Sequence, residues 1–412
     1  MSKIVKIEAF ELFDSRGFPT VSARVFTEGG GEGFSIVPSG ASTGMFEAHE
    51  LRDGGSRILG RGVKKPIEHI KHLIAPALLG IEASNTEEVD RIMCELDGSD
   101  NKERLGANSI LAVSLAAAKA AADEEKTPLY KYLNKGFGNL TLPRPMMNIL
   151  NGGAHADNNL DIQEFMIQPT SPESFAESMD ICTEIYHTLK QILKEKGFST
   201  ATGDEGGFAP NLPSDEAALD LITEAILRAN YSTDRVKICL DAAASEWQTK
   251  SGIYRLPKRD KKWDSDELVS YWKSLCDRYP IASLEDGIGE NDFEAFALLT
   301  AALGYKTQLV GDDLFVTNEK RLKAGFLAGA ANAILIKPNQ IGTLSETLRV
   351  IKMAQDKGYA AVISHRSGDS EDTFISDLAV AVGAGQIKTG APCRSERVAK
   401  YNRLLLIEKE LQ

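Results

Sequence analysis

The chain has 412 residues, 42% of them hydrophobic, which is enough for a large core and for two or three domains. Acidic residues outnumber basic ones by 59 to 47, and the formal net charge is −12. An acidic chain of this kind is a poor general binder of nucleic acid or anionic membranes. Positive charge for a small anionic ligand must therefore come from a few specific residues or from a metal.

The cysteines and the apolar runs indicate the compartment. Five cysteines are scattered along the chain and none forms a CxxC pair, which favours reduced thiols in a cytosol over a disulfide framework or a zinc site. The first residues, "MSKIVKIEAFELFD", carry acids within their apolar stretch and lack a signal-peptide pattern. No apolar run reaches the ~18 residues of a membrane span. We therefore predict a cytoplasmic protein without a membrane span.

The first third of the chain predicts a small α+β domain. Strands are expected at 6–13, 20–26 and 33–40, with the glycine run "EGGGEG" as a hairpin connection between the last two. Helices are expected at 85–96, where Asn85 can cap the first turn, and at the alanine-rich stretch 107–126. A segment rich in Gly, Pro and Asn at 134–146 separates this part from the rest. We expect a capping domain at 1–138 and a second domain at 139–412.

A polar loop follows the third predicted strand. Its sequence, "VPSGASTGMFE" at 37–47, contains Ser39 and lacks the GK[ST] of a phosphate-binding P-loop, so nucleotide binding is not expected. One interpretation is a mobile lid over the mouth of the second domain. The other is a plain surface loop, and this segment alone favours that second interpretation.

Three irregular segments open the second domain and carry candidate catalytic groups. His155 lies in "NGGAHADNN", Gln163 and Glu164 come just before an apolar strand in "DIQEFMIQP", and Glu205 lies in "GDEGGFAPN". A single His or Glu in a loop more often has no catalytic role. However, loops on a rigid scaffold often carry function, and two glutamates near a cation site can supply acid and orienting groups.

From residue 237 onward, short apolar runs repeatedly end in a polar residue, with amphipathic helical segments between them. The terminal residues are spaced by 44, 27, 25, 28 and 23 positions, and they are Asp241, Glu285, Asp312, Lys337, His365 and Lys388. Alternation of strand and helix at this period predicts parallel βα units and a TIM-type (β/α)8 barrel. Such barrels carry their chemistry at the C-terminal ends of the strands. For any single residue the alternative is simple solvent exposure.

The carboxylates at these ends predict a metal site. Asp241, Glu285 and Asp312 would converge in a barrel, where they repel one another unless a cation lies among them. Ligands that are all oxygen favour Mg²⁺ over zinc, whereas helix capping or surface salt bridges are the alternative. A lysine beside a divalent ion should have a lowered pKa, so Lys337 could act as a base, the alternative being a counter-ion. Arg366 is suited to bidentate binding of phosphate or carboxylate.

The motifs together resemble those of a known family over nearly the whole chain. In order they are "VPSGASTG", "NGGAHA", "QEFMI", "GDEGGFAPN", "VGDDLFVTN", "LIKPNQIGT", "SHRSGDSEDTFI" and "QIKTG" with "RSERVAKYN". The set resembles the enolases, the glycolytic 2-phosphoglycerate hydro-lyases, in their bacterial form. The resemblance implies an α+β capping domain and an enolase-type barrel with irregular first units. It also implies two Mg²⁺ ions per active site, a homodimer or octamer, and a secondary cell-surface or secreted pool.

The resemblance also assigns roles. It implies that Lys337 takes the C2 proton of 2-phospho-D-glycerate and that Glu205 is the acid that helps expel the C3 hydroxyl. Glu164 supports that acid and His155 lies by the same face of the substrate, so both are implied to be catalytic as well. The resemblance further implies the tighter Mg²⁺ on the three carboxylates, the second on Ser39, and substrate contacts from His155, Gln163, Glu164, Lys337, His365, Arg366, Ser367 and Lys388. Where the family usually has Asn in "DSRGNPT", this chain has Phe18, a change in local packing. The alternatives are another acid dehydratase of the superfamily, or a non-catalytic plasminogen-binding adhesin.

Overall fold

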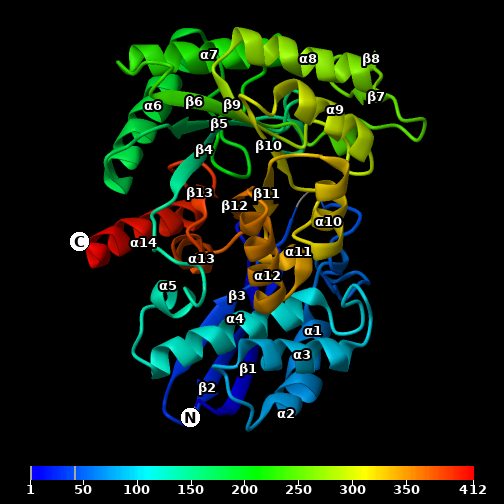
Figure 1. Cartoon of the computed structure of the whole chain (residues 1–412), viewed down its shortest axis with the longest axis vertical. Coiled ribbons are helices and arrows are strands. Elements are labelled where there is room, and N and C mark those ends of the chain that lie inside the picture. Colours follow the sequence, from blue (N-terminus) through cyan, green and yellow to red (C-terminus); the bar gives the residue numbers. More distant parts are fainter. Residues whose placement is uncertain (1, 41–42) are drawn as a thin grey trace.

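A computed structural model describes residues 2–40 and 43–412, so Ala41 and Ser42 of the predicted lid loop lie outside the described residues. The N-terminal part is a three-stranded antiparallel sheet covered by helices (Figure 1). Its strands run in the order β1 (Ile4–Phe13), β2 (Pro19–Thr27) and β3 (Glu32–Ile36). Its helices are α1 (Lys64–His69), α2 (Ala75–Leu78), α3 (Thr86–Asp97), α4 (Ala107–Glu124) and α5 (Leu129–Tyr132).

Helix α4 packs directly on the sheet because its residues are small. Nearly all of its side chains are buried, and many are alanine. Gly33 on β3 lies so close that an added Cβ would come within 2.0 Å of the carbonyl oxygen of Ala116, so only glycine allows this contact. The one lysine within the helix, Lys119, donates to Asp372 at 2.7 Å and thereby ties α4 to the barrel.

The rest of the chain forms a closed barrel of eight strands, which confirms the predicted fold class. Around the barrel the order is β10-β11-β12-β13-β4-β5-β6-β9. The strands are β4 (Arg144–Asn151), β5 (Glu164–Pro169), β6 (Val236–Asp241), β9 (Ile281–Glu285), β10 (Gln308–Gly311), β11 (Ala333–Ile336), β12 (Ala360–Ser364) and β13 (Gly385–Lys388). A small hairpin of β7 (Tyr254–Leu256) and β8 (Lys261–Trp263) lies outside it.

Helices surround the barrel. They are α6 (Phe175–Glu195), α7 (Asp215–Arg228), α8 (Ser265–Arg278), α9 (Phe293–Leu303), α10 (Glu319–Ala328), α11 (Pro338–Ile341), α12 (Leu344–Asp356), α13 (Phe374–Ala381) and α14 (Ser395–Leu411). Helices α7 and α8 lie at the end of the molecule farthest from the N-terminal sheet (Figure 1). No helix in the described ranges is long and apolar enough to cross a membrane.

Strand β5 runs against its two neighbours, and this reversal positions two candidate residues. It is antiparallel to both β4 and β6, whereas the other barrel pairs are parallel. Its first residue, Glu164, is therefore paired with Asp241, the last residue of β6. For this reason Gln163 and Glu164 reach the same barrel mouth as residues that end their strands.

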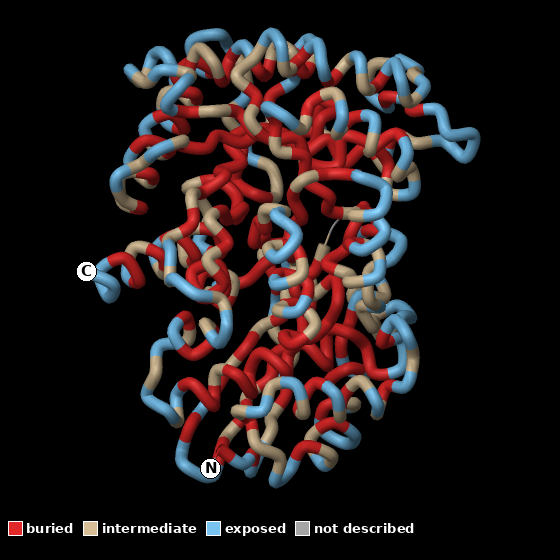
Figure 2. Tube along the Cα trace, viewed as in Figure 1, coloured by how far each residue is buried: buried red, intermediate tan, exposed pale blue. Residues whose placement is uncertain are grey.

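Most residues of the barrel strands are buried, and the tube in Figure 2 is red over much of this part of the chain. An apolar layer crosses its middle and is made by Met146, Met166, Cys239, Val310, Ala333, Leu335 and Val362. Polar side chains lie on both sides of this layer. The interior is thus a packed core with polar groups at each end, as is usual for such barrels.

Candidate active site

A small polar pocket lies at the C-terminal mouth of the barrel. Most of the predicted site residues line it, namely His155, Gln163, Glu164, Glu205, Asp241, Lys337, His365, Arg366, Ser367 and Lys388, together with Ser364. Glu285 and Asp312 do not line it, but each contacts one of its lysines. Ser39 does not line it either and lies on the N-terminal loop, hydrogen-bonded to Gly368. Barrel closure therefore gathers residues that are up to 233 positions apart, from His155 to Lys388.

Lys388 is the central cation of this mouth. Its Nζ lies 3.0 Å from Glu164, 3.1 Å from Asp241 and 2.8 Å from Glu285, and the lysine is almost fully buried. Although burial opposes ionisation, Asp241, Glu164 and Glu285 raise the pKa of Lys388 well above its usual value. Lys388 is therefore a permanent ammonium that can attract a small anionic group.

Lys337 follows β11 and forms an ion pair with Asp312. Pro338 begins the short helix α11 directly after it, so the strand ends at the lysine. Although burial opposes it, Asp312 raises the pKa of Lys337. The lowered pKa predicted from the sequence requires a bound metal ion, and the protein's own groups, Asp312 above all, act in the other direction.

Two residues not assigned from the sequence hold this pair. Gln340 donates to Asp312 Oδ1 at 2.8 Å and accepts from Thr317 at 2.9 Å, while the Thr317 hydroxyl accepts from the Lys337 backbone N–H at 2.9 Å. Gln340 lies within the motif "LIKPNQIGT", so its place beside the lysine could have drawn attention to it. Thr317 likewise lies within the motif "VGDDLFVTN".

Glu164 and Glu205 form a second centre with two histidines. His155 Nδ1 lies 3.4 Å from Glu164 and 3.7 Å from Glu205, and His365 Nε2 lies 3.2 Å from Glu205. Asn148, also not predicted, donates to Glu205 Oε2 at 3.0 Å. Each of these side chains is almost fully buried.

The two glutamates differ in charge. Burial and the Glu205 carboxylate raise the pKa of Glu164 well above its usual value. Although burial acts in the other direction, His365 and His155 hold the pKa of Glu205 well below its usual value. A proton held by this pair therefore resides on Glu164.

A further carboxylate, Asp286, orders the chain beside Asp312. It accepts from the backbone N–H of Asp312 at 2.9 Å and of Asp313 at 2.7 Å. Carboxylate oxygens of Asp286, Asp312 and Asp313 lie within 4.8 Å of one another. Burial and the Asp312 carboxylate raise the pKa of Asp286 well above its usual value. More negative charge thus accumulates around Asp286 and Asp312 than the nearby lysines offset.

The carboxylates at the barrel mouth fit a divalent cation. Burial and Asp241 raise the pKa of Glu285 well above its usual value, and its Oε2 has no hydrogen-bond partner among the described residues. A buried acceptor without a donor is costly, and a cation would remove that cost. The candidate ligands are all oxygen, which suits Mg²⁺. Asp241, Glu285 and Asp312 are the residues that would hold it.

The N-terminal loop reaches this mouth through two contacts. Ser39 and Gly368 exchange backbone hydrogen bonds of 2.7 and 2.9 Å, and the Ser39 hydroxyl donates to Asp14 at 3.1 Å. Arg366 holds Glu47 with both guanidinium nitrogens, at 3.0 and 3.1 Å. Nearby, Arg61 stacks over the ring of Phe18 at 4.4 Å, which shows how this chain packs its unusual residue.

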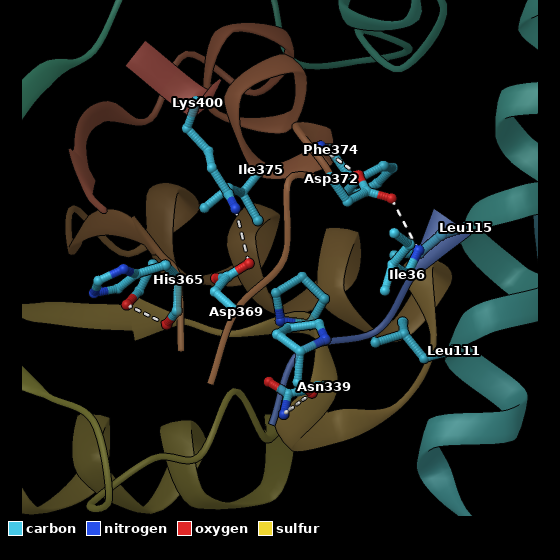
Figure 3. A pocket seen from close by; sticks show the side chains of 13 residues that line it. Ile36, Leu111, Leu115, Asn339, His365, Asp369, Asp372, Phe374, Ile375 and Lys400 are labelled. Atoms are coloured by element: carbon cyan, nitrogen blue, oxygen red, sulfur yellow. Dashed lines mark hydrogen bonds and ion pairs between the residues drawn. The ribbon is translucent and has the colours of Figure 1, made fainter. Parts of the chain in front are cut away.

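A second hollow lies behind the site, between α4 and the barrel, and is mostly apolar (Figure 3). Leu111, Leu115 and Ile36 line one side of it, while His365 and the ion pair of Lys400 with Asp369 lie on the other. It contains none of the mouth carboxylates, so we place the chemistry in the polar pocket.

Two family models match the chain. One, described as "Enolase, N-terminal domain", matches residues 4–133. The other, described as "Enolase, C-terminal TIM barrel domain", matches residues 139–412. Together they extend over both the sheet-and-helix part and the closed barrel.

Proposed function

The chain belongs to the enolase family, and from this premise we propose that it catalyses the reversible dehydration of 2-phospho-D-glycerate to phosphoenolpyruvate. The family supports a hydro-lyase that depends on Mg²⁺. One observation carries the choice of this chemistry: two lysines, of which Lys388 is buried and Lys337 partly buried, and two buried glutamates converge on one pocket at the barrel mouth. Such an arrangement can remove a proton at one carbon and protonate a leaving group at the next.

In the proposed reaction the C2–H bond breaks and its proton passes to the neutral amine form of Lys337, which is available once the charge of Asp312 is offset. The C3–O bond then breaks, and the hydroxyl leaves as water after taking a proton from an acid. We assign Glu205 as that acid. Because the proton of the glutamate pair resides on Glu164 in the free chain, Glu164 would pass this proton to Glu205, which then gives it to the leaving hydroxyl. His155 lies between the two carboxylates and can orient both.

The other residues bind and neutralise the substrate. Proton loss beside a carboxylate builds a second negative charge, and the buried Lys388 ammonium lies where it can stabilise this charge. Gln163 binds near the same group, and Arg366, Ser367 and His365 bind around the phosphate. In the free chain Arg366 holds Glu47, so the substrate phosphate would replace a carboxylate partner.

Mg²⁺, when bound, supplies positive charge to the substrate carboxylate and offsets the carboxylates that surround Lys337. We propose Asp241, Glu285 and Asp312 as ligands of one ion and Ser39 as a ligand of a second. The orphaned Glu285 oxygen and the raised pKa values of Glu285 and Asp286 support a cation at this place.

The test measures the absorbance of the enol product with 2-phospho-D-glycerate as substrate. We expect activity with Mg²⁺, none with EDTA, and a loss of about 10³-fold in Lys337→Ala. Lys273→Ala is the matched control, because Lys273 pairs with Asp277 on the exposed face of α8. Activity that resists chelation, or that survives Lys337→Ala, would refute the mechanism. Turnover of sugar acids in place of 2-phosphoglycerate would favour another dehydratase of the superfamily.

We also propose a homodimer or octamer and a cytoplasmic location, on the support of family membership alone. Light scattering of the purified chain measures its mass in solution. A monomer at micromolar concentration would contradict the assembly.

A further inference from the structure

One fully buried arginine connects the two loops that carry the acid and the phosphate-binding residues. Arg397 lies on α14 and none of its surface is exposed. Its guanidinium donates to the backbone carbonyls of Arg366 at 2.6 Å, Ser367 at 2.7 Å and Asp204 at 3.2 Å. The same group lies 2.7 Å from His365 Nδ1. Asp204 directly precedes Glu205, so this arginine positions both sides of the pocket.

The chemistry of the two groups decides where the His365 proton lies. A guanidinium has only donors, so His365 Nδ1 must accept from Arg397 and cannot carry a hydrogen. Burial and the positive charge of Arg397 outweigh the effect of Glu205 and lower the pKa of His365 to about 4. The ring is therefore neutral near pH 7 and its single hydrogen lies on Nε2.

The other side of the ring faces Glu205. His365 Nε2 lies 3.2 Å from Glu205 Oε1, although the two atoms do not form a hydrogen bond of standard geometry. The described chain offers this nitrogen no other hydrogen-bond acceptor. The Nε2–H is thus the group that His365 presents to the pocket.

We propose that Arg397 is a positioning residue that fixes His365 as the neutral Nε2–H tautomer. His365 then donates one hydrogen bond toward Glu205, but it cannot relay a proton through the ring, because Nδ1 is occupied by a donor. A proton for Glu205 must therefore come from the side of Glu164 and His155. The consequence for catalysis rests on the proposed role of Glu205, whereas the tautomer itself does not.

The first test reads the tautomer in the unmodified chain. Two-bond ¹H–¹⁵N spectra of protein labelled at its six histidines distinguish Nδ1–H, Nε2–H and doubly protonated rings. The signals that disappear in His365→Gln assign the residue. At pH 7 we expect the Nε2–H pattern. An Nδ1–H pattern, or an imidazolium, would overturn the proposal whether or not the chain dehydrates 2-phosphoglycerate.

The second test removes the arginine. In Arg397→Met we expect His365 to populate both tautomers and kcat to fall by roughly 10–100-fold, the usual cost of losing an outer partner of a functional histidine. Arg403→Met is the matched control on the same helix, because Arg403 pairs with Asp377 away from the pocket. It should leave the His365 signals unchanged. A folded Arg397→Met chain with an unchanged tautomer would refute the role. If Arg397→Met does not fold, the native spectrum decides.

Discussion

Two residues of one strand show how differently the two ends of the barrel are built. Gln386 and Lys388 are two positions apart on β13, so both side chains face the interior. At the N-terminal end, Gln386 accepts from Gln168 at 3.1 Å and exchanges hydrogen bonds with Gln308 at 3.1 and 2.7 Å. At the mouth, Lys388 contacts three carboxylates that also repel one another.

The difference separates stability from function. The glutamines are neutral and satisfy each other, so this end needs nothing from outside the chain. The mouth holds carboxylates with raised pKa values and, among the described residues, an acceptor without a donor, which favours the cation and substrate that we propose for it. Buried charge of this kind costs stability, and proteins keep it where chemistry requires it.

The largest effect at the mouth is expected when the proposed acid, Glu205, is made neutral. We expect Glu205→Gln to lower kcat by about 10²–10⁴-fold, because the amide cannot give up a proton. The melting temperature should change little, since the amide still accepts from Asn148. Steady-state kinetics and thermal unfolding of the same samples provide the measurement. If Glu164→Gln alone had this effect while Glu205→Gln were active, Glu164 would be the acid.

The metal site gives the next largest effect. Glu285→Gln should raise the Mg²⁺ concentration for half-maximal activity by about 100-fold or more, because loss of even an outer partner of a ligand usually costs about 10–100-fold. Unfolding without Mg²⁺ should require equal or more denaturant, because a repelled buried carboxylate is removed. The control is Glu294→Gln, which removes one carboxylate from the exposed start of α9. An unchanged Mg²⁺ requirement in Glu285→Gln would rule out this ligand.

At the N-terminal end of the barrel, we expect a substitution to lower stability and to leave kcat nearly unchanged. Gln386→Met leaves the amides of Gln168 and Gln308 without their shared partner, and we expect a loss of about 1–3 kcal/mol in the free energy of unfolding. The kcat of the folded variant should stay within about twofold of the native value, since the apolar layer separates this end from the mouth. Urea unfolding and kinetics test both statements. A large loss of kcat would show that the two ends are coupled.

The smallest effect is expected at a buried carboxylate outside the mouth, where a raised pKa has no catalytic role. Asp90 on α3 accepts from the backbone N–H of Ser345 at 2.8 Å, and burial raises its pKa to about 6. The folded chain therefore holds this proton more tightly than the unfolded chain, whose Asp pKa is about 3.9. Its contribution to stability is complete below pH ~4 and is lost as the pH rises through about 6.

Asp90→Asn removes that titration while keeping an acceptor for Ser345. The free energy of unfolding of the variant, measured relative to that of the native chain, should increase by about 1–3 kcal/mol when the pH is raised from 4 to 7. Denaturant unfolding at both pH values measures the difference. If the variant and the native chain differed by the same free energy of unfolding at both pH values, the raised pKa of Asp90 would be contradicted.

Much of the site could be predicted because its residues follow a regular pattern. Parallel strands bring their C-terminal ends to one mouth, so the polar residues that end apolar runs had to converge there. The supporting residues Thr317, Asn148 and Arg397 could not be found in this way. Each acts through hydrogen bonds to residues distant in the sequence, and no local pattern records such partners.

The sequence by itself determined the barrel, its helices and the carboxylates and lysines at its mouth, because hydrophobic periodicity is a local property of the chain. Only the tertiary structure decided that β5 runs antiparallel to its neighbours and that Asp312 raises the pKa of Lys337. The tertiary structure alone also places Arg397 against His365 Nδ1, the contact from which we infer that the proton of His365 lies on Nε2. Charges and protons respond to every group within a few ångströms, and those neighbours are known only when the chain has closed upon itself.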